Sequence, residues 1–171
     1  GAGRGIGEEV GLKFLKNDHF VYFLVHRKIQ KSKLLNKIKN FSNFDIICGD
    51  LTKNEFLKKI EKKIKYCDNL INNAASTNKK FFPDVSEKDF NYLININLKS
   101  VFLLSQIFSK KMIKKKIKGN IINLSSQLGH IGAYNRSLYC ITKFGIEGLT
   151  KSMSLDLAKF GIKVNSIALT K

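Results

Sequence analysis

The residues with the clearest potential for chemistry are Tyr139 and Lys143, which are separated by four positions. On a helix, this separation places both side chains on one face. A tyrosine with a free pKa near about 10 is a poor base at neutral pH. An ammonium about 4 Å away contributes roughly 4 kcal/mol at an effective dielectric of about 20, enough to lower that pKa by about three units. The pair is therefore suited to exchange a proton with a bound molecule.

The pair is weak on its own because lysine is very frequent in this chain. With 28 lysines among 171 residues, the five tyrosines give about 0.8 such pairs by chance. The interpretation therefore depends on the motifs around the pair.

A glycine-rich segment, GAGRGIG, opens the chain ahead of an apparent helix, and its glycines are Gly1, Gly3, Gly5 and Gly7. Glycine permits positive φ and lets backbone amides approach a pyrophosphate at a helix N-terminus. The spacing is GxxxGxG rather than GxGxxG, because Ile6 and Glu8 occupy the positions that would complete the second pattern. The segment predicts a phosphate-binding turn, although any glycine-rich turn gives a similar pattern.

The charges that follow the expected strand at residues 20–25 favour NADP(H) over NAD. NAD enzymes place a carboxylate there for the ribose 2′-hydroxyl, whereas NADP enzymes place an arginine. Residues 19–44 contain no Asp or Glu, and the strand ends in Val25-His26-Arg27-Lys28. Arg4, inside the glycine segment, could also reach the ribose 2′-phosphate that distinguishes NADP(H) from NAD. The alternative is that Arg27 and Lys28 only solubilise the start of a helix.

Stretches with strand-like and helical patterns alternate along the whole chain. Strands are expected at 20–25, 45–48, 69–72, 120–125 and 162–168. Helices are expected after the opening glycines, at 28–39, 54–65 and 137–160, and within 89–116. This alternation predicts an α/β fold, a Rossmann-type doubly wound parallel sheet with helices on both faces, formed by one domain over residues 1–171. Ligands of such sheets bind beyond the carboxyl ends of the strands.

Together the motifs resemble the short-chain dehydrogenase/reductase family over essentially the whole chain. The family pattern is a GxxxGxG loop, an Asp after the third strand, Asn-Asn-Ala-Gly after the fourth, an Asn in a long helix, and a Ser thirteen residues before Tyr-x-x-x-Lys. These occur here in order, as residues 1–7, Cys48-Gly49-Asp50-Leu51, Asn72-Asn73-Ala74-Ala75, Asn95-Ile96-Asn97-Leu98, Asn123-Leu124-Ser125-Ser126, and Tyr139 with Lys143.

The resemblance implies a role for each residue. Tyr139 would exchange the proton with the substrate oxygen, and Lys143 would lower its pKa and bind the nicotinamide ribose. Ser126 would hold the carbonyl, and Asn97 would support a proton-relay water. The cofactor site would be formed by Gly1, Gly3, Arg4, Gly5, Ile6, Gly7, Arg27, Asp50, Leu51, Asn73, Ala74, Tyr139 and Lys143.

Some of these assignments have alternatives in the same segments. Ser125 could replace Ser126, but only Ser126 has the family spacing to Tyr139. Asn95 could replace Asn97, although the segment around Asn97 fits the family better. Three further residues between Ser126 and Tyr139 either contact a polar substrate or are merely solvated, namely His130, Tyr134 and Arg136.

The chain departs from the family pattern in a few places. Ala75 replaces a glycine, which would cost on the order of 1 kcal/mol if that position required positive φ. Leu169-Thr170 stands where Pro-Gly usually follows the sixth strand. We also expect the family's first strand before Gly1 and its substrate-closing segment after Lys171, so that activity belongs to a longer protein.

The formal net charge of +18 does not favour nucleic-acid binding, because only three of the 31 basic residues are Arg and the lysines are scattered. One lysine cluster, residues 109–118, is expected to end a helix, where cations suit the dipole. No run is long and apolar enough to span a membrane. The cysteines lack metal-ligand spacing, so we expect no metal site, and reduced thiols in a cytoplasmic protein.

The resulting functional expectation is a ketone reductase, with 3-oxoacyl thioesters as the first substrate class and sugars or polyols as the alternative. An acidic acyl carrier protein would suit the basic surface, and the resemblance implies a homo-oligomer, a dimer or a tetramer. An alternative of another class is a dinucleotide-binding regulatory protein without catalysis, against which the intact Ser126, Tyr139 and Lys143 argue.

Overall fold

The computed structural model describes residues 1–170 and divides into two compact units, one from Gly1 to Phe56 and one from Leu57 onward. Lys171 lies outside the described residues.

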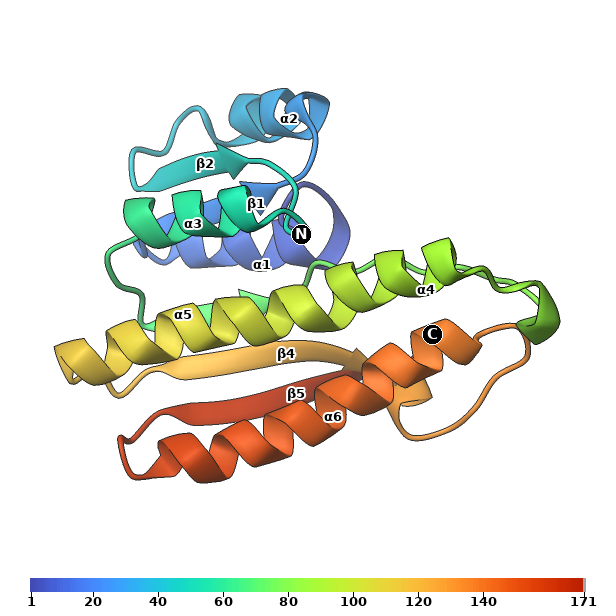
Figure 1. The fold of residues 1–171 in the computed structure, drawn as a ribbon. Helices are drawn as coiled ribbons and strands as arrows, with labels where there is room; N and C mark the ends of the chain where they lie inside the picture. Colours follow the sequence, from blue (N-terminus) through green and yellow to red (C-terminus); the bar gives the residue numbers. More distant parts are fainter. Residues whose placement is uncertain (171) are drawn as a thin grey trace. The chain divides into compact units, whose positions relative to one another are not determined.

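The first unit is built around two parallel strands (Figure 1). The elements in chain order are α1 (Gly5–Lys16), β1 (Val21–Val25), α2 (Lys28–Ile38), β2 (Phe44–Cys48) and α3 (Asn54–Lys63), the last of which crosses the division between the units. Strand β1 pairs with β2 in the register Val21↔Phe44 to Val25↔Cys48.

The core of the first unit joins both strands to helices α1 and α2. Its fully buried side chains are Leu15 from α1, Phe23 and Val25 from β1, and Leu34 and Ile38 from α2, with Ile46 from β2. Helix α1 approaches β1 so closely that a Cβ on Gly11 would lie 2.1 Å from the Phe23 ring. This packing holds the glycine segment at the carboxyl end of β1, where the Ala2 amide donates to the Leu24 carbonyl.

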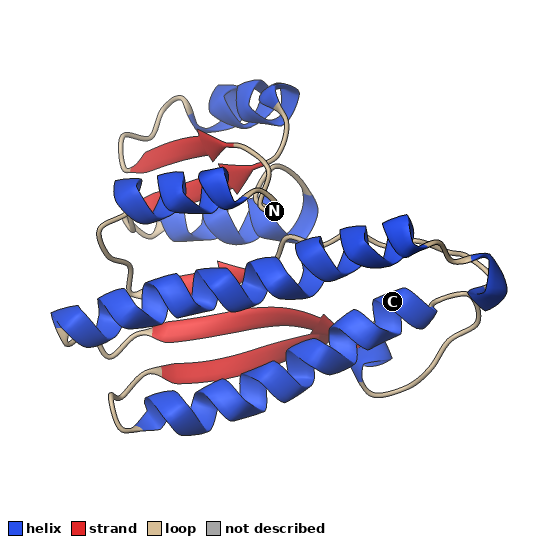
Figure 2. Cartoon of the chain, viewed as in Figure 1, coloured by secondary structure: helices blue, strands red, loops and turns tan. Residues whose placement is uncertain are grey.

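The second unit has a parallel sheet of three strands in the order β3-β4-β5 (Figure 2). The elements are β3 (Asn69–Asn72), a 3₁₀ turn (Phe82–Asp84), α4 (Glu87–Ile94), a π-helical turn (Asn95–Lys99), α5 (Ser100–Lys115), β4 (Asn120–Ser126), a second 3₁₀ turn (Gln127–Gly129), α6 (Ser137–Ala158) and β5 (Lys163–Leu169).

The sheet of the second unit buries polar side chains as well as apolar ones. Strand β4 buries Ile121, Asn123 and Ser125 and leaves the residues between them half-buried. The Asn72 side chain donates to the Asn123 Oδ1 at 2.9 Å, and the Asn123 Nδ2 donates to the Thr150 hydroxyl at 2.9 Å. Asn72 also donates to Ser105 of α5 at 3.0 Å. This buried chain of hydrogen bonds ties β3 and β4 to α5 and α6.

The prediction of a Rossmann-type α/β fold with parallel strands is confirmed, and most element boundaries agree within two residues. The strands form two hydrogen-bonded sheets, one in each unit, and the single domain over 1–171 stays a prediction. The lysine cluster ends a helix as expected, because α5 stops at Lys115 and Lys116 adopts a left-handed conformation. The π-helical turn inside the expected 89–116 segment was not predicted.

The buried amide chain gives a test of the second unit. Replacing Asn123 by Ala removes one hydrogen bond from each of the buried Asn72 and Thr150 side chains, so the free energy of unfolding should fall by about 2 to 4 kcal/mol. Urea denaturation measures this change. The matched control is Asn165→Ala on the exposed face of β5, which should stay within about 0.5 kcal/mol of the parent. Equal effects of the two substitutions would show that the buried hydrogen bonds of Asn123 contribute nothing to stability.

Candidate active site

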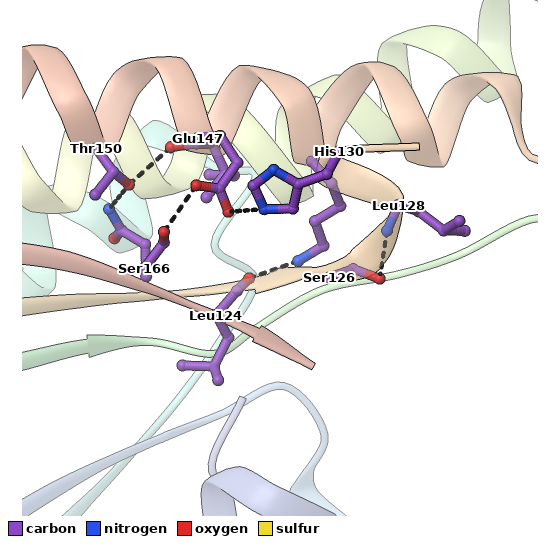
Figure 3. Close-up of polar contacts among 10 residues, drawn as sticks. Leu124, Ser126, Leu128, His130, Glu147, Thr150 and Ser166 are labelled. Atoms are coloured by element: carbon purple, nitrogen blue, oxygen red, sulfur yellow. Dashed lines mark hydrogen bonds and ion pairs between the residues drawn. The ribbon is translucent and has the colours of Figure 1, made fainter. Parts of the chain in front are cut away.

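Ser126 is the last residue of β4 and stands at the carboxyl end of the three-stranded sheet. Its hydroxyl oxygen accepts a hydrogen bond from the Leu128 amide at 3.2 Å, which fixes the 3₁₀ turn that follows (Figure 3). Because the oxygen accepts from the turn, the hydroxyl proton remains available to a second partner. Tyr139 is a candidate partner, since the Ser126 side chain lies close enough to lower the pKa of Tyr139.

Tyr139 and Lys143 lie on consecutive turns of α6, as the sequence predicted. The Lys143 side chain is 3% exposed, and its Nζ donates to the Leu124 carbonyl at 2.6 Å. The same Nζ lies 5.4 Å from the centroid of the Tyr139 ring. Strand β4 and helix α6 therefore bring Ser126, Tyr139 and Lys143, three of the four expected catalytic residues, together in the second unit.

The pKa of Tyr139 differs from the sequence-based expectation, because the structure raises it instead of lowering it. Burial is the largest cause and raises the pKa, while the hydrogen bond with Ser126 and the charge of Arg136 lower it. The Lys143 ammonium contacts the ring and the Leu124 carbonyl. In this structure, Tyr139 is thus set up as a proton donor rather than as a tyrosinate.

Burial lowers the pKa of Lys143 to about 8, and the nearby negative charge of Glu147 opposes this decrease. The cost of burying the ammonium is reduced by its hydrogen bond to the Leu124 carbonyl. The side chain is thus protonated at neutral pH but titrates well below an ordinary lysine.

Asn97 is 2% exposed and lies in the π-helical turn between α4 and α5. Its Oδ1 accepts from the Ser76 amide and its Nδ2 donates to the Ser76 carbonyl, both at 2.8 Å. The Nδ2 also donates to the Thr142 hydroxyl at 3.1 Å, and Thr142 donates to the Tyr139 carbonyl at 2.8 Å. Asn97 therefore connects the loop after β3 to the helix that carries Tyr139. The sequence analysis missed Ser76 and Thr142, although Thr142 lies between Tyr139 and Lys143.

Asn73 and Ala74 follow the end of β3 directly and are half-buried at the same sheet edge as Ser126. Ala75 is not among the described residues with positive φ, which are Asp18, Lys116 and Asn135 outside glycine. The replacement of the family's glycine at this position therefore carries no left-handed strain.

The glycine segment of the first unit forms the turn that leads into α1. Helix α1 begins at Gly5, whose φ is +57°, and Arg4 precedes it without a side-chain hydrogen bond to the first turn. The backbone amides of a helix start without such a cap are available to an anion. Arg4 and Ile6 are exposed beside this helix start, and Gly7 is half-buried.

Gln30 couples the glycine segment to the start of α2. A Cβ on Gly3 would lie 2.8 Å from the Gln30 Cβ, so only glycine fits there without movement. The Gln30 side chain also accepts from the Arg27 amide at 3.0 Å. Arg27, like Arg4, is exposed at the start of a helix. Gln30 was not singled out from the sequence, because its role depends on this tertiary contact.

Asp50 follows β2 and is held by two hydrogen bonds. Its Oδ1 accepts from the Thr52 amide at 2.9 Å and from the Thr52 hydroxyl at 2.8 Å. Burial acts to raise the pKa of Asp50, but these bonds and the charges of His26 and Lys53 lower it overall. The carboxylate is therefore ionised and fixed at the carboxyl end of β2, whereas the neighbouring Leu51 side chain is buried.

His130, Tyr134 and Arg136, whose roles the sequence left open, have different surroundings in the loop between β4 and α6. The Arg136 guanidinium donates to the Thr77 hydroxyl at 2.6 Å and to the Asn78 carbonyl at 3.1 Å. Tyr134 is 97% exposed, and the His130 Nε2 lies 3.5 Å from a Glu147 carboxylate oxygen. Arg136 and His130 thus have protein partners.

Within residues 1–170, no cluster of three or more His, Cys, Asp or Glu side chains could hold a metal ion. None of the helices described is long and apolar enough to cross a membrane. The three cysteines are free.

Comparison with known proteins gives consistent matches over nearly the whole chain. The family model for short chain dehydrogenases matches residues 1–170. The 3-oxoacyl-[acyl-carrier-protein] reductase of Buchnera aphidicola subsp. Baizongia pistaciae is 32% identical over 171 residues, which cover 98% of this chain and 69% of that protein. The L-xylulose reductase of Mesocricetus auratus is 31% identical over 167 residues, covering 98% of this chain and 67% of that protein.

A solved structure, that of ElxO with NADP bound, has a TM-score of 0.89 at 32% identity and covers 98% of this chain and 70% of that one. The chain thus spans about two thirds of the length of the relatives that it matches.

The buried ammonium predicts a pH-dependent contribution to stability. Because the folded pKa of Lys143 lies near 8, below that of an unfolded lysine, the unfolded state holds more protons between the two values, and stability rises with pH there. From about pH 7 to about pH 9.5, the parent should gain about 2 kcal/mol relative to Lys143→Met in urea unfolding. Lys151→Met, which removes an exposed lysine of α6, should show no such relative gain. A pH-independent difference between the parent and Lys143→Met would contradict the buried charge.

Proposed function

Because the chain belongs to the short-chain dehydrogenase/reductase family, whose members are oxidoreductases acting on CH–OH and carbonyl groups with NAD(P), we propose that its protein transfers a hydride between NADP(H) and a carbonyl or secondary alcohol. The observation that carries this proposal is the convergence of Ser126, Tyr139 and Lys143 in the second unit, with the Ser126 side chain close enough to lower the pKa of Tyr139 and Lys143 buried beneath the Tyr139 ring.

In the reduction, the Tyr139 hydroxyl donates its proton to the carbonyl oxygen while the carbonyl carbon accepts the hydride. The raised pKa of Tyr139 keeps this proton in place until the substrate oxygen becomes basic. The Ser126 hydroxyl donates to the same oxygen and holds it toward Tyr139. The Lys143 ammonium stabilises the tyrosinate that remains. When bound, NADP(H) supplies the hydride and, in its oxidised form, a positively charged nicotinamide that favours the tyrosinate.

Two residues of this chain keep the reacting groups in place. Asn97 holds the loop after β3 and, through Thr142, the turn of α6 that carries Tyr139. In our proposal, Asn97 also supports a water that returns the proton to Tyr139.

The first unit fits a dinucleotide phosphate group. The uncapped start of α1 offers backbone amides to the pyrophosphate, and Gly3 admits the close packing of this turn. Arg4 and Arg27 provide exposed guanidinium groups for a 2′-phosphate. Asp50 and Leu51 would contact the adenine, while Asn73 and Ala74 in the second unit would line the nicotinamide side.

For the substrate, we propose a 3-oxoacyl thioester carried by acyl carrier protein. The similarity to the Buchnera 3-oxoacyl-[acyl-carrier-protein] reductase supports this class, and the net charge of +18 suits an acidic carrier. The L-xylulose reductase of Mesocricetus auratus is nearly as similar, so a sugar or polyol is the second candidate. A regulatory dinucleotide-binding protein without catalysis is not favoured, because Ser126, Tyr139 and Lys143 are all present and close together.

The proposal includes self-association and a cytoplasmic location. Exposed apolar side chains lie on α5 and α6, namely Phe102, Ile141, Phe144 and Leu155, and a dimer or tetramer would cover them. The free cysteines suit a reducing compartment.

The proposed mechanism predicts a specific loss of chemistry in Tyr139→Phe. In the full-length protein, kcat for NADPH-dependent reduction should fall by about 100-fold or more, because the proton donor is lost. The assay uses a panel of 3-oxoacyl thioesters and sugar ketones, followed by NADPH absorbance. Tyr66→Phe, at an exposed tyrosine of the second unit, serves as the control and should keep the parental kcat. Full turnover by Tyr139→Phe would refute the mechanism, and no turnover of any panel member by the parent would refute the substrate class.

The two arginines predict the dinucleotide preference. NADPH should bind the parent more tightly than NADH, and Arg4→Ala or Arg27→Ala should each weaken NADPH binding by about 10- to 100-fold while changing NADH binding little. Calorimetric titration of both dinucleotides measures these affinities, with Lys31→Ala on the exposed side of α2 as the control. Equal affinity of the parent for NADPH and NADH would overturn the assignment.

A further inference from the structure

Glu147 is a buried carboxylate that the mechanism above does not use. It follows Lys143 by four residues on α6, so that Tyr139, Lys143 and Glu147 occupy successive turns of one helix face. Its side chain points back toward β4 and β5, and the residue is 8% exposed (Figure 3). A carboxylate seldom occupies such a position unless other groups compensate its charge.

Three elements besides α6 present groups to this carboxylate. The Ser166 hydroxyl of β5 donates to Oε2 at 2.8 Å, and the His130 Nε2 lies 3.5 Å from Oε1. The buried Ser125 hydroxyl of β4 faces the same carboxylate, but neither it nor Oε1 has a hydrogen bond of ordinary geometry. His130 and Glu147 form an ion pair only when the imidazole is protonated.

The turn that follows Ser126 packs directly on this part of α6. A Cβ on Gly129 would lie 2.9 Å from the Ser125 hydroxyl, 3.1 Å from the Lys143 carbonyl and 3.2 Å from the Glu147 Cγ. Only a glycine allows this approach without displacement of its neighbours. The segment that positions Ser126 and the helix that positions Tyr139 thus meet at Glu147.

The charge of Glu147 also acts on Lys143. Burial tends to raise the pKa of Glu147, but the hydroxyls of Ser125 and Ser166 and the charges of His130 and Lys151 lower it overall. The carboxylate is therefore ionised at neutral pH, and its charge opposes the lowering of the Lys143 pKa by burial. The charged groups that face it are Lys143 and Lys151 from α6 and His130 from the loop after β4.

We propose that Glu147 is a positioning residue for the reaction: its buried carboxylate, in contact with His130 and hydrogen-bonded to Ser166, clamps the turn after Ser126 to α6 and provides the counter-charge of Lys143. This inference rests on the proposed function for its catalytic consequence, while the clamp itself concerns the folded chain alone. Glu147 contacts no reacting atom and acts through Ser126 and Lys143.

The catalytic consequence is tested by pH profiles of kcat and kcat/KM in the full-length protein. Glu147→Gln keeps the shape of the side chain and removes its charge, so Lys143 should lose its proton at lower pH. The alkaline limb of the profile should therefore move to lower pH, and kcat should fall about tenfold or more with a smaller change in KM. Glu147→Asp should restore part of kcat and move the limb back toward the parental position.

The matched control is Asp156→Asn, which removes an exposed carboxylate from the same helix and should leave the profile unchanged. A parental kcat together with an unmoved alkaline limb in Glu147→Gln would overturn the proposal. If Glu147→Gln does not fold, Ser166→Ala and His130→Asn remove one partner each, and both should lower kcat more than they change KM. Parental kinetics in both would likewise overturn it.

A second measurement is independent of activity. In a double-mutant cycle of His130→Asn and Glu147→Gln, followed by urea unfolding, the shifts of the midpoint should be non-additive, because the two side chains are in contact. Additive shifts would refute the clamp. If the parent reduces no carbonyl compound, the proposed function fails, and this cycle still decides whether Glu147 and His130 form the clamp.

Discussion

The burial of one ammonium group, that of Lys143, is the constraint around which the second unit is organised. A lysine that is 3% exposed needs a fixed acceptor, and the Leu124 carbonyl of β4 provides one at 2.6 Å. That bond ties helix α6 to the end of β4. Because Tyr139 lies one turn before Lys143 and Ser126 two residues after Leu124, the same bond also sets the tyrosine hydroxyl against the serine hydroxyl.

The rest of the unit supports this arrangement through buried polar contacts. Asn123 and Thr150 join β4 to α6 on the far side of Lys143, and Asn97 with Thr142 joins α6 to the loop after β3. Such buried hydrogen bonds contribute little net stability when satisfied, but they are costly to break, so they select one packing of helix on sheet. Glu147, with Ser166 and His130, belongs to the same set of contacts.

The elements that were predicted well from the sequence are those whose local pattern decides their structure. The strand at residues 69–72 was predicted with its observed bounds, and the apolar run 20–25 became β1 with a difference of one residue. The π-helical turn at Asn95–Lys99 was missed, because its side-chain spacing differs little from that of an α-helix and tertiary contacts of Asn97 accompany it.

For the site, the motifs predicted which residues the second unit brings together, but not their electrostatics. Burial raises the pKa of Tyr139. This could not be predicted, because burial depends on side chains that are distant in the sequence and that no local spacing reveals. Gln30 was missed for the same reason. Glu147 had a signal in the sequence, since it continues the four-residue spacing of Tyr139 and Lys143, but such a spacing gives no sign of burial.

Burial keeps Tyr139 protonated, and in our proposal the positively charged nicotinamide of NADP⁺ lowers its pKa so that it can act as a base. The most direct measurement is a titration of tyrosinate absorbance in the full-length protein, taken as the difference between the parent and Tyr139→Phe, with and without saturating NADP⁺. We expect a midpoint above about 10 without the dinucleotide and a clear decrease with it. A midpoint that NADP⁺ leaves unchanged would contradict this role of Tyr139.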